Sequence, residues 1–286
     1  MEDGWAKLLF QFELTGWEMT SNGVVRNGAE AKAKEVLELS QFVVTKIPET
    51  ERPTPDFIVQ KNGEQVLLEV TEKEPMEAFA QMLHQAKEEG SATLTREISS
   101  SNRLDGVIRA KAKQLESPVA LNGFKVLWIA GTHADSEFMT EAIFRTLYGT
   151  VRVSAVPSLD MEEMAKVGIA VRYCFYYNRF TFYRARELDG VIFYGHGRGY
   201  VFVNPLGVRL KEFRVSEICS MFARAEGMRV VDPEVQHGEL DMFLGLDVDR
   251  SDGRAKWQYL REKYGVLTSP LVENQFLGLM PVEIPD

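Results

Sequence analysis

The chain contains little cysteine, with Cys174 and Cys219 its only two among 286 residues. Two isolated thiols form neither a metal-binding spacing nor a disulfide framework. The histidines are equally scattered, at His84, His133, His196 and His237. The sequence therefore gives zinc chemistry little support and predicts two reduced core cysteines in a cytoplasmic protein.

Long apolar runs are also absent, since none approaches the roughly 20 residues that a transmembrane helix needs. The first residues, Met1-Glu2-Asp3, are acidic where a secretory signal peptide is positively charged. No cleavage site follows the apolar run Leu8–Phe12. We therefore expect no membrane partner.

Positive charge is in deficit, with 33 Lys and Arg against 42 Asp and Glu and a net charge of −9. This balance argues against a general nucleic-acid coat protein, because binding to phosphate backbones depends on Lys and Arg. The charge is uneven, however: residues 151–230 hold twelve basic side chains against eight acidic ones. A basic segment in an acidic chain is compatible with an enzyme that binds nucleic acid on one face.

The most informative part of the chain has the pattern of a β-hairpin. An apolar run, Phe57–Val59, is followed by Asn62-Gly63 and then by a second apolar run, Val66–Leu68. Asn-Gly between two such runs is a strong signal for a tight hairpin turn.

Two carboxylates flank the buried part of this hairpin. Asp56 opens the first run, and Glu69 lies where the second leaves its buried section. On adjacent antiparallel strands the two can meet at one end of the sheet. Paired carboxylates with a lysine nearby are what a Mg²⁺-dependent phosphodiesterase needs, because oxygen ligands hold a hard cation that polarises the phosphate and activates water.

Pro55-Asp56 followed by Leu68-Glu69-Val70 resembles the motif of the PD-(D/E)XK nuclease superfamily, which has a restriction endonuclease-like fold. The resemblance implies DNA as partner, Mg or Mn as cofactor, and Asp56 and Glu69 as metal ligands. The superfamily pattern places a lysine two residues after the glutamate, whereas this chain has Thr71 there and Lys73 as the nearest lysine.

The flanking segments follow the superfamily order of helix, three strands, helix and strand over residues 27–130. Apolar spacing predicts helices over Asn27–Ser40 and Arg103–Leu115, and strands at Phe42–Val44 and Lys125–Ala130. The resemblance implies a metal-supporting glutamate on the first helix. Its best match is Glu30, with Glu35 in reserve.

Lys73 or Lys111 could replace the missing lysine. On an extended strand Lys73 points to the same side as Glu69, but it lies roughly 13 Å further along. Lys111 and Gln114 are three residues apart and so share a helix face. A helix crossing the sheet can bring both over the carboxylates, which favours Lys111 as the catalytic lysine, with Gln114 beside it.

The segment Arg172–Arg186 is rich in arginine and aromatic residues and contains no acid. Asn178-Arg179 suggests a hairpin turn with aromatics on both arms. The arginines could hold phosphates while aromatic rings stack on bases. The alternative is a sheet whose aromatics fill the core while the arginines stay solvated. The candidate nucleic-acid contacts here are Arg172, Arg179, Arg184 and Arg186.

A second hairpin is predicted by apolar runs at Val191–Tyr194 and Tyr200–Val203 around a glycine-rich turn. Arg198 at its tip is a further candidate nucleic-acid contact, beside His196. A phosphate-binding loop is the alternative, but it requires a following helix, and a strand follows instead.

Other segments complete the expected architecture. Ser136–Tyr148, Ser216–Ala225 and Arg254–Tyr264 have helical spacing, Val151–Val156 reads as a strand, and the tail from Val266 should pack back on the body. Residues 75–89 look helical, and the Ser/Thr-rich residues 90–102 look like a link. Residues 247–252 fail the calcium-loop spacing, so an N-capped turn before the helix at Arg254 is expected.

The sequence therefore predicts an α/β protein with a mixed central sheet flanked by helices. We expect an N-terminal segment at 1–26, a nuclease-like core at 27–156, and an extension of hairpins and helices at 157–286. The leading function is Mg- or Mn-dependent hydrolysis of DNA, and a homodimer is left open. One alternative is a catalytically inactive nuclease fold that serves as a nucleic-acid-binding or assembly module. Another is an unrelated α/β protein.

Overall fold

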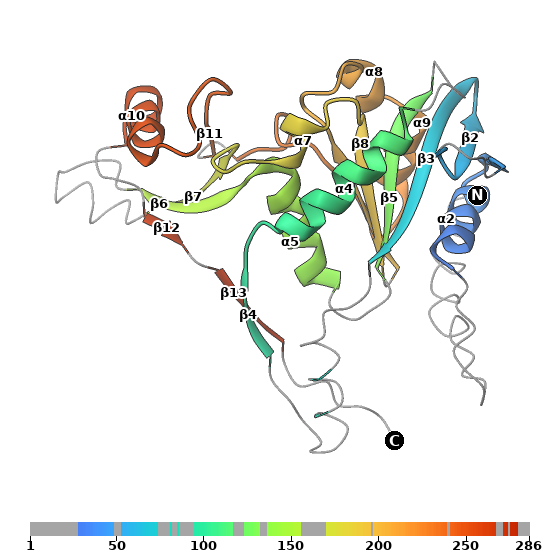
Figure 1. Cartoon of the computed structure of the whole chain (residues 1–286), viewed down its shortest axis with the longest axis horizontal. Coiled ribbons are helices and arrows are strands. Elements are labelled where there is room, and N and C mark those ends of the chain that lie inside the picture. Colours follow the sequence, from blue (N-terminus) through green and yellow to red (C-terminus); the bar gives the residue numbers. More distant parts are fainter. Residues whose placement is uncertain are drawn as a thin grey trace. The chain divides into compact units, whose positions relative to one another are not determined.

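The computed structural model describes most of the chain and divides it into two compact units (Figure 1). The first comprises Met1–Pro75, Ile108–Ser136 and Ala185–Asp232, and the second comprises Met76–Val107, Glu137–Arg184 and Pro233–Asp286. These segments alternate along the chain, so neither unit coincides with residues 27–156 or 157–286. The described residues are 28–48, 53–73, 81, 85, 94–116, 123–131, 136–155, 170–195, 197–238, 241–266, 271–273 and 275–279. The N-terminal segment 1–26 lies outside them.

The first unit contains a seven-stranded mixed sheet in the order β1-β2-β3-β5-β8-β9-β10. β3 pairs in parallel with β5, β5 with β8 and β9 with β10, while the other neighbours are antiparallel. This arrangement confirms the expected α/β class. The strands are β1 (Val43–Lys46), β2 (Phe57–Lys61), β3 (Glu64–Lys73), β5 (Phe124–Gly131), β8 (Gly190–Gly195), β9 (Arg198–Val203) and β10 (Met228–Val231).

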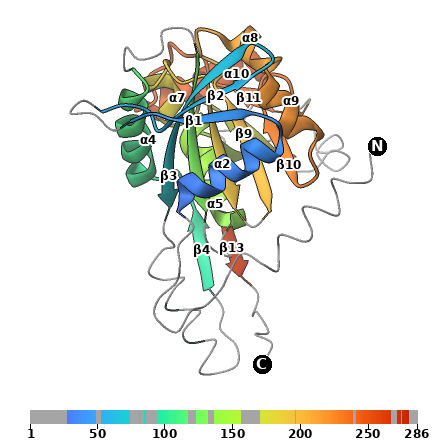
Figure 2. The ribbon, with the colours of Figure 1, turned by 90° about the vertical axis from the view of Figure 1, so that its right-hand side faces the viewer.

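One face of this sheet is covered by α2 (Ala29–Leu39) and α9 (Glu217–Arg224), and Figure 2 shows α2 lying across it. Ala33, Val36 and Leu37 of α2 are buried in the same apolar cluster as Leu68 and Val70 of β3. Because successive strand residues point to opposite faces, Leu67 and Glu69 face the other side of the sheet. A short helix, α8 (Leu210–Arg214), precedes α9.

The hairpin of β2 and β3 has the register that the sequence predicts. Phe57 pairs with Leu68 and Val59 with Val66, and the turn residues Asn62 and Gly63 have positive φ angles of 48° and 83°. These angles belong to the tight turn that favours Asn-Gly. Asp56 and Glu69 are the residues directly beyond this last pair, so they lie at the same end of the hairpin.

The second unit has a four-stranded sheet in the order β11-β7-β6-β12 and a two-stranded ribbon of β4 and β13. α10 begins after Asp252, whose side chain accepts hydrogen bonds from the backbone of Arg254 and Ala255, so the expected N-capped turn is confirmed. The strands are β4 (Leu94–Ile98), β6 (Val151–Ala155), β7 (Ala170–Phe175), β11 (Met242–Phe243), β12 (Leu271–Glu273) and β13 (Gln275–Leu279). The helices are α5 (Ser136–Tyr148), α7 (Thr181–Arg184) and α10 (Gly253–Tyr264). α4 (Asn102–Gln114) contributes residues to both units.

Two expectations about this unit are wrong. No hairpin forms around Asn178-Arg179, because Tyr176 takes a left-handed conformation (φ 62°) and the chain then enters helix α7. The Ser/Thr-rich link contains strand β4, which pairs with β13 far along the chain. Most of the helix expected at 75–89 lies outside the described residues.

Candidate metal centre

Asp56 and Glu69 are brought together by neighbouring strands. One oxygen of Asp56, Oδ2, accepts a hydrogen bond from the backbone N–H of Val70 at 2.8 Å. Glu69 Oε1 accepts one from Lys111 Nζ at 2.7 Å. The other oxygen, Glu69 Oε2, is buried and has no hydrogen-bond partner. A buried carboxylate oxygen without a partner is costly unless a further ligand completes it.

The electrostatics of Glu69 reflect this enclosure, since only 1% of the residue is exposed. Burial raises its pKa from 4.5 to about 7, and the charge and hydrogen bonding of Asp56 act in the same direction. The hydrogen bond and charge of Lys111 act in the opposite direction without overcoming burial. The influence of Asp56 on this pKa agrees with the placement of the two carboxyl groups at one end of the hairpin.

Helix α4 supplies the lysine, as the crossing geometry predicts. Lys111 Nζ donates to Gln114 Oε1 at 3.2 Å as well as to Glu69, so Gln114 fixes the direction of the ammonium group. Ile108 and Ala112 are buried on the adjoining stripe of the helix, and Leu115, directly after its end, is buried as well. Lys73 lies at the end of β3, four residues beyond Glu69, and Thr71 occupies the motif position.

A second lysine, which the sequence analysis missed, lies on the other side of Asp56. Lys46 on β1 forms an ion pair with Glu30 and lies 3.6 Å from Asp56 Oδ1. Although partial burial acts to lower the pKa of Lys46, the two carboxylates raise it above its ordinary value. The sequence carried no signal for this contact, because it depends on the register of β1 against β2, which places Lys46 opposite Phe57.

Glu30 is therefore connected to Asp56 through Lys46. Among the described residues, no group of three acidic, histidine or cysteine side chains is arranged to hold a metal ion. Glu35, the reserve candidate, forms an ion pair with Lys32 at 3.0 Å. The geometry thus offers two carboxylates as metal ligands, Asp56 and Glu69, and Glu30 does not join them, although the sequence led us to expect it.

Asp56 and Glu69 fit a divalent cation by the chemistry of their donors. Hard cations such as Mg²⁺ and Mn²⁺ take carboxylate oxygens as ligands, and Mg²⁺ commonly keeps several waters beside one or two carboxylates. Glu69 Oε2 supplies an unused oxygen at the centre of the site. Metal binding would give this buried atom the partner it lacks.

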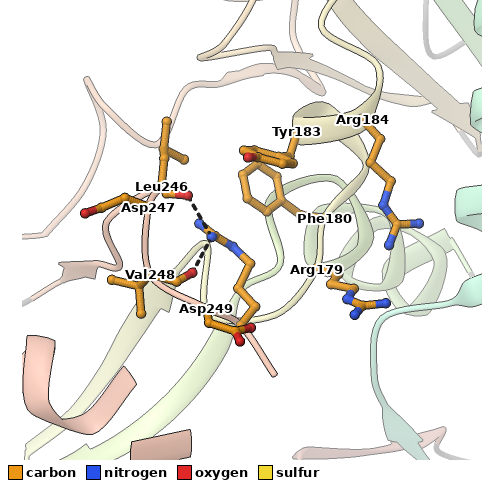
Figure 3. A pocket seen from close by; sticks show the side chains of 9 residues that line it. Arg179, Phe180, Tyr183, Arg184, Leu246, Asp247, Val248 and Asp249 are labelled. Atoms are coloured by element: carbon orange, nitrogen blue, oxygen red, sulfur yellow. Dashed lines mark hydrogen bonds between the residues drawn. The ribbon is translucent and has the colours of Figure 1, made fainter. Parts of the chain in front are cut away.

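The predicted nucleic-acid contacts separate into different places. Arg179 and Arg184 line a pocket of about 340 Å³ in the second unit, on one side of the Phe180 and Tyr183 rings (Figure 3). Arg250 also lines the pocket, and its guanidinium group donates to three backbone carbonyls, those of Gly245, Leu246 and Val248. Arg172 lies on β7, and Arg186 and Arg198 are exposed residues of the first unit.

The aromatics of this segment mainly fill the core of the second unit. Phe175, Tyr176, Phe180 and Phe182 are all at most 5% exposed. Tyr183 differs, with 41% of its surface exposed beside the pocket. The core interpretation therefore holds for these four residues. Tyr183 is exposed on one side, and its ring contacts the Phe180 ring and the Arg250 guanidinium group.

Comparison of the chain with protein-family models, with curated proteins and with solved structures finds no significant match. No helix in the described part of the chain is long and apolar enough to cross a membrane.

Proposed function

We propose that the protein is a nuclease that hydrolyses phosphodiester bonds in DNA with Mg²⁺ or Mn²⁺. The observation that carries this proposal is the meeting of Asp56 and Glu69 on adjacent strands, with Lys111 2.7 Å from Glu69. The arrangement agrees with what the resemblance to the PD-(D/E)XK superfamily implies. It also offers a solution to the substitution of the motif lysine by Thr71, because Lys111 brings an ammonium group from another element.

Each residue would have a distinct task. Asp56 and Glu69 would hold the cation, which when bound polarises the phosphate and lowers the pKa of a water ligand. Lys111 would stabilise the negative charge that develops on the phosphate, while Gln114 keeps the ammonium group in position. The hydrogen bond from Val70 N–H to Asp56 Oδ2 fixes that carboxylate, so it needs little reorganisation.

The proposal is tested by incubating the purified chain with plasmid and single-stranded DNA in Mn²⁺, with EDTA as the blank. Asp56→Asn and Glu69→Gln should each abolish cleavage, because they remove ligand charge and keep side-chain shape. Glu72→Gln is the matched control, since Glu72 lies on the same strand but points to the opposite face. Cleavage that persists in Asp56→Asn would rule out this site.

A second candidate is a nuclease fold that binds nucleic acid or assembles complexes without cleaving. Two observations favour it. Thr71 replaces the motif lysine, and Lys46 and Lys111 already neutralise the two carboxylates. DNA binding that is unaffected by Asp56→Asn, with no cleavage in any divalent ion, would select this function.

Substrate contact and cellular context extend the proposal. Arg179 and Arg184 would hold phosphates and Tyr183 would stack on a base. The buried free thiols Cys174 and Cys219 are compatible with the reducing cytoplasm. A homodimer is left open, and sedimentation analysis would test it.

A further inference from the structure

Lys46 occupies a position that the proposed chemistry does not explain. It ends β1 and pairs in register with Phe57, which places it beside Asp56 at the start of β2. Its ammonium group is 3.6 Å from Asp56 Oδ1, bonds to Glu30, and lies 5.0 Å from the centre of the Phe57 ring. Contacts from α2 and from the start of β2 therefore fix it next to a candidate metal ligand.

The two lysines of the site divide the carboxylates between them. Lys111 neutralises Glu69, with Gln114 as its second partner, and Lys46 neutralises Asp56, with Glu30 as its second partner. The carboxylates that these lysines contact differ in exposure. The side chain of Glu69, beside Lys111, is 2% exposed, whereas those of Asp56 and Glu30, beside Lys46, are 21% and 48% exposed. A cation arriving from solvent therefore meets the Lys46 side of the site.

An ammonium group and a divalent cation would compete for the same side of the Asp56 carboxylate. Its Oδ2 already accepts the Val70 N–H, so Oδ1 is the oxygen that faces Lys46. A cation bound to Oδ1 would lie within a few ångströms of a group of like charge. Like charges at that separation repel strongly where solvent access is partial.

We propose that Lys46 is an internal counter-ion of the metal centre, which a divalent cation must displace from Asp56. Glu30 retains the displaced ammonium group, so Glu30 acts as the partner that holds Lys46 and is not itself a metal ligand. Lys46 thus keeps the affinity for the metal low, because its ammonium group competes with the cation for Asp56. This inference rests on the proposed function, because it assumes that Asp56 binds the cation.

The test measures Mn²⁺ affinity by calorimetry on the full chain, without DNA. Lys46→Met should bind Mn²⁺ about tenfold more tightly than the wild type, because one competing charge has gone. Lys46→Arg keeps the charge and should resemble the wild type. Lys34→Met is the matched control: Lys34 forms an exposed pair with Glu38 at 3.7 Å on α2, and its removal should leave Mn²⁺ affinity unchanged.

Circular dichroism establishes that each variant is folded. Lys46→Gln, which is uncharged but polar, should reproduce the tighter binding if the apolar methionine disturbs β1. Equal or weaker Mn²⁺ binding by both neutral variants overturns the role of Lys46 while leaving the metal centre intact. Failure of every variant and of the wild type to bind Mn²⁺ overturns the proposed function together with this inference.

Discussion

The raised pKa of Glu69 predicts an unusual pH dependence of stability in the metal-free protein. Burial raises the pKa of Glu69 to about 7 in the folded state, whereas an exposed glutamate in the unfolded chain has a pKa of 4.5. The stabilisation from the protonated group is therefore fully present below the unfolded value and is lost as the pH rises through about 7. Most acidic side chains act in the opposite direction, because ion pairs lower their pKa.

The magnitude follows from the two pKa values. The difference between about 7 and 4.5 corresponds to about 3 kcal/mol between the low-pH and high-pH limits. About half of the folded molecules carry an ionised Glu69 at a pH near 7, so most of the loss should occur between roughly pH 5 and pH 8. The Lys111 ion pair is already included, since it limits the rise of the pKa.

Urea denaturation in EDTA at several pH values measures this effect. Glu69→Gln isolates it, because the neutral amide resembles the protonated acid and cannot ionise. The variant should match the wild type near pH 4, below the unfolded pKa, and exceed it by up to about 3 kcal/mol near pH 8. Mn²⁺ should remove the difference by binding the ionised wild-type site. A constant difference between the two proteins across this range would refute the reasoning.

Three further outcomes are expected. Arg209→Met should lower the free energy of unfolding by about 3–5 kcal/mol in urea titrations. The reason is that Asp189, which is only 4% exposed, loses the guanidinium group that lies 2.5 Å from it. A loss below about 1 kcal/mol would contradict this expectation. Gly63→Ala should lower the free energy of unfolding by about 1 kcal/mol, because Gly63 has a φ angle of +83° that alanine rarely adopts. Gly253→Ala should cause no loss, because Gly253 has open space around it and no positive φ angle. Arg179→Ala should weaken single-stranded DNA binding and reduce its salt dependence by about one counterion, and an unchanged salt slope would remove Arg179 from the interface.

Local patterns in the sequence predicted the hairpin of β2 and β3 and the helices α2 and α4. Asn62-Gly63 determines a turn by its own backbone preferences, and apolar spacing determines a helix face, so both can be read without knowledge of distant residues. The same is true of the cap at Asp252. The approach of Lys111 to Glu69 was also predicted, because helix geometry places Lys111 and Gln114 on the same face.

Features that depend on distant pairing could not be predicted. Strand β4 forms because β13 pairs with it, and β10 because β9 offers a parallel edge. Lys46 entered the site only because β1 pairs with β2 in one register, which its four residues do not specify. The expected hairpin at Asn178-Arg179 was wrong because Tyr176, a bulky residue, adopts a left-handed conformation that propensity disfavours.

The turn of the β2–β3 hairpin is held by a helix that comes much later in the chain. Glu64 Oε2 accepts the backbone N–H of Glu217, 153 residues away, and Asn62 donates to the side chain of Glu217. During synthesis the hairpin can form early, but these anchors exist only after α9 has left the ribosome. A nascent chain thus contains Asp56 and Glu69 long before Glu217 can bond to the hairpin turn. Because these contacts close a long loop of the chain, their formation is expected to be slow. Premature termination before Glu217 would therefore produce a polypeptide that contains both carboxylates but lacks this anchorage.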